Sequence, residues 1–316
     1  MPPDRRRGFE GGPVFVTGAG GFIGSAVVRA LVSRGAVVRA LAGAPGQRSY
    51  ELPPEVEPVY ADIEDQQALS RMAADASIAI HLAGPPSVAA SFQAPIEYAR
   101  VHATGTVAML EACRAARVPR FVYVSSAEVY GRVQTNPVSE EHPLQPRSPY
   151  AASKAAAEQF VRAYGHSFGM ETVVLRPFSV YGPNLPLTSV TGTILRQVLW
   201  EDEVVLGDLR PVRDYCFLDD VVEGILLAAE VPCLSTTTVN LGTGLGTSVG
   251  DLACLALKLA GRQLPVRTDS SRRRPAGVDL DELVADGGRA AELGWRPQVL
   301  LEVGLRQTLN WMAAQS

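Results

Sequence analysis

Short apolar runs of strand length alternate along this chain with longer segments in which apolar residues recur with helical spacing. Parallel strands need a crossover connection that is usually a helix, so this alternation is typical of a parallel sheet covered by helices on both faces. The runs expected to form strands are Pro13–Thr17, Ala36–Leu41, Ser77–Gly84, Arg120–Ser126 and Glu171–Pro177. The pattern therefore predicts an α/β fold with a doubly wound parallel sheet.

Two of the intervening segments carry clear helix signals. "FIGSAVVRALVSRG" places Ile23, Val27 and Leu31 on one helical stripe and stops at Gly35, a residue typical of helix C-termini. "APIEYARVHATGTVAMLEACRAARV" reads as one long helix with Pro95 in its first turn. After residue 180 the alternation weakens and glycine and proline become frequent, which predicts a smaller second lobe.

Composition narrows the class of protein. The 316 residues are 47% hydrophobic and 20% charged with a net charge of −4, which excludes a disordered chain and gives no attraction to nucleic acid. The four cysteines are widely spaced, which suggests neither a zinc site nor a disulfide framework. No signal peptide or long apolar run indicates a membrane partner. We expect a soluble, cytoplasmic protein with no bound metal.

A glycine-rich loop follows the first predicted strand. "VTGAGGFIG" places Gly18, Gly21 and Gly24 between that strand and the first helix. Glycines at these positions allow a tight turn, the approach of a pyrophosphate to the backbone, and close packing of helix on strand, while the helix N-terminus faces the anion. In this context the motif predicts a dinucleotide site, although a glycine-rich turn without a ligand is the simpler alternative.

The choice between NAD and NADP stays open at this stage. Dinucleotide sites usually carry an acidic residue at the end of the second strand, where this chain has Ala42, and Arg39 and Arg48 are only near that place. Asp62 in "YADIED" either reaches the adenine or is an exposed loop carboxylate.

A hydroxyl, a phenol and an ammonium group are expected near the same crevice. Tyr150 and Lys154 in "YAASK" are four residues apart, so they share a face if the segment is helical. Ser126 ends a central strand, where open α/β sheets bind ligands. A phenol titrates near 10 and needs a nearby cation to act as a base at neutral pH, which Lys154 or an oxidised nicotinamide would supply. The three residues predict hydride-transfer chemistry at a carbon that bears oxygen.

At this point the sequence resembles the extended short-chain dehydrogenase/reductases, specifically the NAD(P)-dependent nucleotide-sugar epimerase/dehydratase family. The motifs that carry the resemblance are "TGAGGFIG", "HLAG", "PIEYARVHATGT", "RFVYVSSAEVYG", "SPYAASK", "LRPFSVYGP", "RDYCFLDDVVEG", "NLGTG" and "LGWRP". The resemblance implies a Rossmann-type domain over 13–180 with a return segment near 215–242, a substrate-binding lobe over most of 181–316, and a homodimer. Residues 1–12 are expected to form a flexible tail.

The resemblance also implies roles for individual residues. Ser126, Tyr150 and Lys154 match the catalytic positions. The coenzyme would contact Gly18, Gly21, Phe22, Ile23, Gly24, Asp62, Ile63, Leu82, Ala83, Gly84, Tyr150, Lys154 and Pro177. The nucleotide-diphosphate sugar would contact Ser126, Asn184, Arg213 and Arg274.

Alternatives remain for the substrate residues. Arg213 and Arg274 match positions near the diphosphate, a role that suits a guanidinium group, but each could instead pair with Asp214 or Asp279. The substrate pocket could be lined by Pro86, Ser87, Phe178, Asn184 and Thr188. Three positions depart from the family pattern: Ala42 replaces an acid, Pro86 replaces a lysine of some epimerases, and His102 replaces an asparagine. We interpret His102 as a packing residue.

Glu128 in "SSAEVYG" has two interpretations. Family members that dehydrate or decarboxylate sugars carry a glutamate here, and a transient 4-ketone would acidify the neighbouring C5 hydrogen for such a base. Alternatively, Glu128 pairs with a loop cation or faces solvent. Ala127 lacks the acid that 4,6-dehydratases use on the leaving hydroxyl, which disfavours that reaction.

The interpretation that these features favour is an NAD(P)-dependent nucleotide-sugar epimerase that acts through a transient 4-keto sugar. The alternatives are a 4-ketoreductase, a C5-reacting dehydratase or decarboxylase, and, more remotely, a non-catalytic protein that senses dinucleotides.

Overall fold

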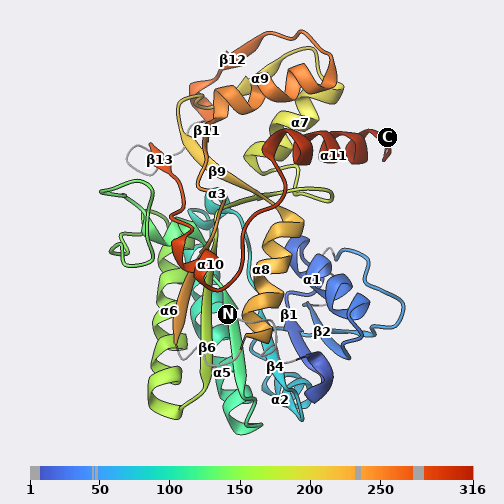
Figure 1. The fold of residues 1–316 in the computed structure, drawn as a ribbon, viewed down its shortest axis with the longest axis vertical. Coiled ribbons are helices and arrows are strands. Elements are labelled where there is room, and N and C mark those ends of the chain that lie inside the picture. Colours follow the sequence, from blue (N-terminus) through green and yellow to red (C-terminus); the bar gives the residue numbers. More distant parts are fainter. Residues whose placement is uncertain (1–7, 45, 47–48, 232–235, 273–280, 316) are drawn as a thin grey trace.

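The computed structural model describes residues 8–44, 46, 49–231, 236–272 and 281–315 (Figure 1). Residues 1–7 of the expected tail lie outside this part of the chain. Phe9–Gly11 form a short 3-10 helix, and the Phe9 side chain packs into the core, so the folded domain includes residues before 13.

Seven parallel strands form the central sheet, in the order β10-β6-β5-β4-β1-β2-β3. Their bounds are β1 Val14–Thr17, β2 Val38–Gly43, β3 Pro58–Tyr60, β4 Ile78–His81, β5 Arg120–Val124, β6 Glu171–Pro177 and β10 Thr237–Leu241. The five predicted strands are confirmed, although β4 and β5 end before Gly84 and Ser126. Strand order reverses direction between β1 and β4, which creates the crevice where such sheets bind ligands.

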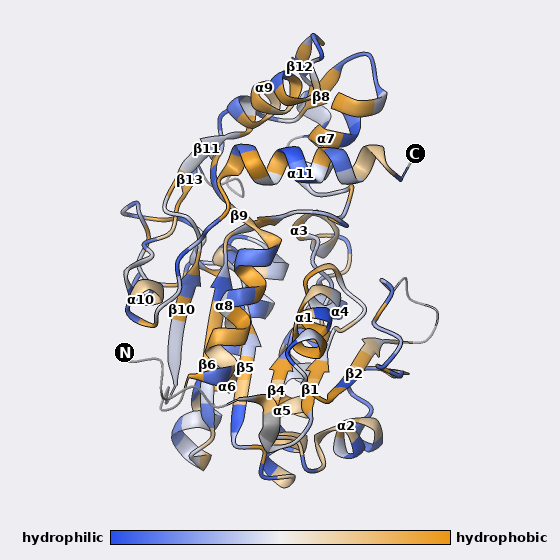
Figure 2. Ribbon diagram, turned by 45° about the vertical axis from the view of Figure 1, so that its right-hand side comes forward, coloured by the Kyte–Doolittle hydropathy of each residue, from blue (hydrophilic) through white to orange (hydrophobic). Residues whose placement is uncertain are grey.

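Helices cover both faces of this sheet, as the sequence pattern predicts. α1 (Phe22–Ser33) and α8 (Leu218–Glu230) pack together on one face, and α2 (Gln66–Ala73), α5 (Gly105–Ala115) and α6 (Pro149–Phe168) cover the other. Alternate side chains of β1 explain the two layers, since Val14 and Val16 enter one core cluster and Phe15 the other. β1 and β4 in the middle of the sheet accordingly stand out as apolar in Figure 2.

The long helix expected after Pro95 is interrupted. It consists of α4 (Pro95–Ala99), a π-helical segment (Arg100–Thr104) and α5. A π-helical turn closes on the fifth following residue and so accommodates one extra residue, a feature that amphipathic spacing does not reveal. His102 lies in this segment and is buried against α6, where its Nδ1 binds the Ser153 hydroxyl at 2.8 Å.

The remaining elements form a second group at the top of Figure 1, around a third core cluster. Its strands are β7 Ser179–Tyr181, β8 Val204–Leu206, β9 Val212–Phe217, β11 Gly246–Ser248, β12 Val266–Thr268 and β13 Glu282–Leu283. Its helices are α7 Val190–Trp200, α9 Val249–Ala260 and α11 Leu301–Ala313. Short helices complete the fold at α3 Val88–Ser91, η4 Ala127–Tyr130, η5 Ser270–Arg272 and α10 Gly288–Glu292. None of the helices in the described ranges is long and apolar enough to cross a membrane.

Asp214 connects the second group to the end of the central sheet. Its fully buried carboxylate accepts hydrogen bonds from the backbone and hydroxyl of Thr243 (2.8 and 2.6 Å), the amide of Gly244 (2.8 Å) and the amide of Ala285 (3.2 Å). These donors come from the loop after β10 and the segment after β13. The carboxylate therefore fixes β9, and with it the neighbouring Arg213, to two other segments.

Replacement Asp214→Ala should destabilise the protein by roughly 3 kcal/mol, because several buried donors lose their acceptor. The exposed Asp286, which accepts a hydrogen bond from Gly288 within its own turn, provides the matched control Asp286→Ala. Urea denaturation followed by circular dichroism measures both variants. Equal, small changes in the free energy of unfolding would contradict the connecting role of Asp214.

Candidate active site

The glycine-rich loop lies between the end of β1 and the start of α1, against the loop after β4. Gly18 has φ +67°, and a Cβ there would lie 2.7 Å from the Ala83 amide nitrogen. A Cβ at Gly24 would lie 2.0 Å from the Gly18 carbonyl oxygen. The close packing of turn, helix and neighbouring loop therefore requires glycine at both positions.

Gly21 differs from these two glycines. It is the N-cap of α1 without a side-chain cap, its φ is −82°, and a Cβ there would meet Gly18 alone among its non-neighbours, at 3.1 Å. Packing within the protein thus restricts this position less, and the first-turn amides of Phe22 and Ile23 stand at the open end of the helix. A phosphate group fits such an end, because unsatisfied N–H groups and the helix dipole both favour an anion. The loop therefore fits the pyrophosphate of a dinucleotide.

The neighbouring loops fix Asp62 and Ile63. Asp62 accepts hydrogen bonds from Arg100 (3.2 Å) and the Glu64 amide (3.0 Å), and the Arg100 guanidinium lowers the pKa of the Asp62 carboxyl. Ile63 is buried against α5, where a Cβ on Gly105 would lie 2.6 Å from its side chain. The Asp62 carboxylate thus has a structural partner, whereas the expected coenzyme contact stays a prediction.

Of the two arginines near the second strand, Arg39 is the one that the structure describes. Arg39 donates to the carbonyl of Met72 at 3.2 Å and to that of Ala74, at the C-terminal end of α2. Arg48 lies outside the described residues. Ala42 is buried, and the Tyr50 amide donates to the Gly20 carbonyl at 2.9 Å. The Arg39 guanidinium therefore binds the carbonyls at the end of α2 and does not supply a positive charge for the 2′-phosphate of NADP.

The three predicted catalytic residues come together at the ends of β5 and α6. Ser126 caps η4 and accepts a hydrogen bond from the Glu128 amide at 3.2 Å. Tyr150 lies in the first turn of α6, where Ser148 caps the helix, and the nearby Ser126 side chain acts to lower the pKa of its phenol. Lys154 follows on the next turn of the same face.

Burial determines the protonation of the phenol and the ammonium. Burial raises the pKa of Tyr150 to about 12, and the negative charge of Glu128 acts in the same direction. Burial lowers the pKa of Lys154 to about 8, against the opposing effect of Glu158. The Lys154 ammonium donates to the Val124 carbonyl at 3.0 Å. At neutral pH this site therefore holds a neutral phenol beside a protonated lysine.

His102 borders the phenol. Its ring centroid lies 5.4 Å from that of Tyr150 and 5.6 Å from that of Tyr98, with edge-on geometry in both cases. Burial lowers the pKa of His102 to about 2, so the imidazole is neutral. A Cβ on Gly84 would lie 2.3 Å from its Nε2, an atom that has no hydrogen-bond partner within the described ranges. These contacts agree with a packing residue beside the site.

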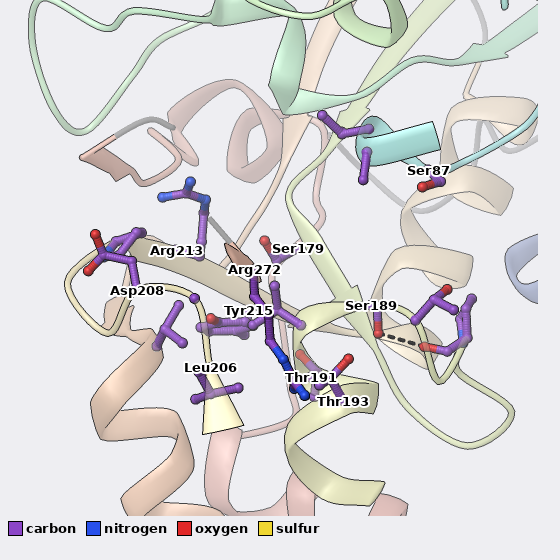
Figure 3. A pocket seen from close by; sticks show the side chains of 18 of the residues that line it. Ser87, Ser179, Ser189, Thr191, Thr193, Leu206, Asp208, Arg213, Tyr215 and Arg272 are labelled. Atoms are coloured by element: carbon purple, nitrogen blue, oxygen red, sulfur yellow. Dashed lines mark hydrogen bonds between the residues drawn. The ribbon is translucent and has the colours of Figure 1, made fainter. Parts of the chain in front are cut away.

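Two cavities adjoin these residues. The larger, of about 580 Å³, is lined mainly by α3, the segment before α7, the first turns of α7 and strands β7, β8 and β9. The smaller, of about 170 Å³, is lined by Ser126, Tyr150 and Pro177. Glu128 and Arg213 line both. In the view of Figure 3, Asp208 and Arg213 lie on the left of the larger cavity and Ser189 on the right.

The predicted substrate residues fall into three groups. Arg213 lines both cavities, and among the described residues it forms no ion pair with Asp214, whose carboxylate accepts from backbone amides. Arg274 and Asp279 lie outside the described residues. Asn184, with φ +68°, is absent from the lining of both cavities. The pocket residues expected at Pro86, Ser87 and Thr188 line the larger cavity, and Pro86 and Phe178 line the smaller.

Tyr215 and Arg272 are among the residues that line the larger cavity but were not predicted from the sequence. Tyr215 is 4% exposed, and its hydroxyl has no partner within the described residues. Arg272 donates to the Val205 carbonyl at 2.9 Å and lines the same space. Their positions in the sequence indicated a place near the substrate residues, because Tyr215 follows Arg213 by two positions and Arg272 belongs to the same arginine run as Arg274.

Comparison with known proteins gives concordant results. Residues 14–242 match the NAD dependent epimerase/dehydratase family. The UDP-glucose 4-epimerase of Mycolicibacterium smegmatis is 34% identical over 95% of this chain and 98% of its own length. The dTDP-glucose 4,6-dehydratase of an Actinoplanes species is 30% identical over 95% and 98%. The structure of MoeE5 in complex with UDP-glucuronic acid and NAD superposes with a TM-score of 0.88, at 30% identity, over 96% of this chain and all of that one.

We predict that Lys154 titrates near pH 8 in the folded protein. The pKa is lowered, so the ammonium is present below that pH and is lost above it. The chain contains two lysines, Lys154 and the exposed Lys258, so ¹³C-lysine labelling gives two resolvable side-chain signals, of which Lys258 is the internal reference. A Lys154 signal that titrates near 10.4, the ordinary lysine value, would contradict this prediction.

Proposed function

The chain belongs to the NAD-dependent epimerase/dehydratase family, and we propose that it is a nucleotide-sugar epimerase that acts through a transient 4-keto sugar. The observation that carries this proposal is that Ser126, Tyr150 and Arg213 line one cavity, with Lys154 one helical turn beyond Tyr150. A 4-epimerase needs a hydroxyl group to hold the sugar oxygen, an acid–base group at that oxygen, and a hydride acceptor beside the carbon.

We propose NAD as the coenzyme, held by the glycine loop, Asp62 and Ile63, the loop of Leu82, Ala83 and Gly84, the pair Tyr150 and Lys154, and Pro177. The open N-terminus of α1 supports a pyrophosphate at the glycine loop. Among the described residues, the hydrogen bonds of Arg39 to the end of α2 favour NAD over NADP. NAD supplies a site that takes a hydride from sugar C4 and returns it.

The proposed substrate is a nucleoside-diphosphate hexose, with UDP-glucose and its 4-epimer as the first candidates because several relatives are UDP-glucose 4-epimerases. The diphosphate would lie in the larger cavity, where Arg213 and Arg272 offer positive charge. The buried hydroxyl of Tyr215 would gain a partner from the nucleotide. Roles for Asn184 and Arg274 stay predictions from the family pattern.

The chain's own groups handle the proton and the position of the sugar. Ser126 would share its hydroxyl between the Tyr150 phenol and the sugar 4-oxygen. Tyr150 would take the 4-hydroxyl proton and return it to the oxygen of the epimer. Because burial raises the pKa of Tyr150 to about 12, proton removal needs positive charge nearby, and Lys154 provides it one helical turn away. The carbonyl of Val124 orients the Lys154 ammonium.

Glu128 supports a second candidate function. It lines both cavities, and its charge acts on Tyr150, so it stands within the site. A carboxylate there could remove the C5 proton of a 4-keto sugar, which would give a dehydratase or decarboxylase. Ala127, a buried residue on the smaller cavity, still offers no acid for a leaving hydroxyl, which disfavours a 4,6-dehydratase. A 4-ketoreductase would use the same trio but consume reduced coenzyme.

We further propose that residues 181–316 mostly form the substrate-binding lobe and that the protein is a cytoplasmic homodimer. The exposed apolar side chains of Ile96 on α4 and of Phe160 and Phe168 on α6 support an interface on these helices. The free thiols of the described cysteines suit a reducing compartment.

Tyr150→Phe should lower kcat for conversion of UDP-glucose to its 4-epimer by about 1000-fold, because the variant cannot move the proton. The dissociation constant for NAD should change less than about threefold, which excludes a sensor role for the phenol. Tyr164 on the same helix donates to Glu111 and lies outside both cavities, so Tyr164→Phe is the matched control. Coupled assay and calorimetric titration measure both quantities. Retained turnover in Tyr150→Phe would refute the assigned role.

Gly21→Ala should weaken NAD binding by about tenfold or more while shifting the melting temperature by less than about 2 °C. The added methyl group would fill the space through which the pyrophosphate reaches the backbone, whereas it would contact few atoms of the protein itself. Gly287, the N-cap of α10, has nothing within 4 Å of an added Cβ and serves as the control Gly287→Ala. Equal NAD affinity in both variants would place the coenzyme elsewhere.

A further inference from the structure

A buried carboxylate lies directly behind the three catalytic residues. Glu158 is fully buried on α6, one helical turn beyond Lys154 and two turns beyond Tyr150. It binds Arg176 through two hydrogen bonds of 2.9 and 2.6 Å and accepts a third, of 2.6 Å, from the Ser125 hydroxyl. None of the three residues lines either cavity, so this cluster belongs to the support of the site and not to its surface.

The Ser125–Glu158 hydrogen bond connects the two elements that carry the reacting groups. Ser125 immediately precedes Ser126 at the end of β5, and its amide donates to the Leu175 carbonyl at 2.7 Å. Glu158 lies on the helix that carries Tyr150. The bond therefore fixes the distance between the Ser126 hydroxyl on one element and the Tyr150 phenol on the other.

Glu158 also supplies the negative charge closest to Lys154 on this helix. The titratable groups that act on the ammonium or lie against it come from several elements: Glu158 on α6, Tyr123 on β5, His81 on β4 and His102 on the π-helical segment. Burial lowers the pKa of His81 to about 3 and of His102 to about 2, so both imidazoles are neutral. Glu158 is therefore the group in this set that carries a charge opposite to that of Lys154.

We infer that Glu158 is a positioning residue of the proposed epimerase reaction: through Ser125 it sets the place of Ser126 relative to Tyr150, and its carboxylate, one helical turn from Lys154, stabilises the ammonium group. The inference rests on the proposed function for its first part. The second part concerns the protein itself and is tested without turnover.

The positional part is tested with two variants, each of which removes one hydrogen bond to Glu158. Ser125→Ala removes the bond on the side of the active site and keeps every charge in place. Arg162→Met removes a contact of 3.3 Å with the same carboxylate from the partly exposed outer face. We expect Ser125→Ala to lower kcat about tenfold with KM and NAD affinity within about twofold, and Arg162→Met to change kcat less than about twofold. Equal effects of the two variants would overturn the inference.

The electrostatic part is tested by a pair of substitutions that act in opposite directions. Glu158→Gln removes negative charge and should move the Lys154 titration to lower pH by about half a unit or more. Arg176→Gln removes positive charge, while Ser125 and Arg162 still donate to Glu158, and should move it to higher pH. The ¹³C-lysine signals of NAD-loaded full-length protein measure both shifts, with Lys258 as reference. A purely structural ion pair would move Lys154 in the same direction in both variants, or not at all.

The two arms separate failure of this inference from failure of the proposed function. If wild-type protein converted no nucleotide sugar, the epimerase proposal would fail, yet the opposite shifts of the Lys154 signal would still decide the role of the Glu158 charge. If Glu158→Gln and Arg176→Gln did not fold, Ser125→Ala would decide the positional part.

Discussion

The buried ion pair between Glu158 and Arg176 is the interaction on which the arrangement of the site depends. It joins α6 to the end of β6 and, through Ser125, to the end of β5. Removing one partner of such a pair leaves an uncompensated buried charge and typically costs about 3–5 kcal/mol. Ser126 and Tyr150 lie on different elements, so the distance between their side chains depends on this connection.

The same burial that fixes the site determines its chemistry. A phenol whose pKa is raised to about 12 is a good proton donor and a poor base, and the balance changes only when positive charge comes close. Lys154, held between the Val124 carbonyl and the Tyr123 ring, stands where that charge is needed. Glycines on the other side of the crevice leave the backbone open for a pyrophosphate. Sheet topology thus brings the glycine loop and the residues Ser126, Tyr150 and Lys154 to the same edge of the sheet.

Much of this arrangement was predictable from the sequence, because it is encoded in local spacing. Alternating apolar runs gave the central strands, the glycine spacing gave the loop at α1, and the four-residue separation placed Tyr150 and Lys154 on one helical face. These signals depend on neighbours within a few residues. The π-helical segment around His102 was not predicted, because the apolar periodicity continues through it.

Contacts between distant residues could not be predicted in the same way. Glu158 and Ser125 are 33 residues apart, and only the fold shows that they share a hydrogen bond. The pairing of Arg213 with Asp214 suggested by adjacency is not formed, since neighbours on a strand point to opposite faces. Arg272 lines the larger cavity, a placement that composition alone does not reveal.

In the proposed reaction a hydride leaves sugar C4 and returns to the same carbon within one site. This is tested by incubating NAD-loaded protein with UDP-glucose in D2O, without added reductant, and examining the product by mass spectrometry and NMR. We expect the 4-epimer to form with no deuterium bound to carbon. Deuterium at C5, or loss of water or CO2 from the sugar, would contradict it and would assign Glu128 a role as a second base.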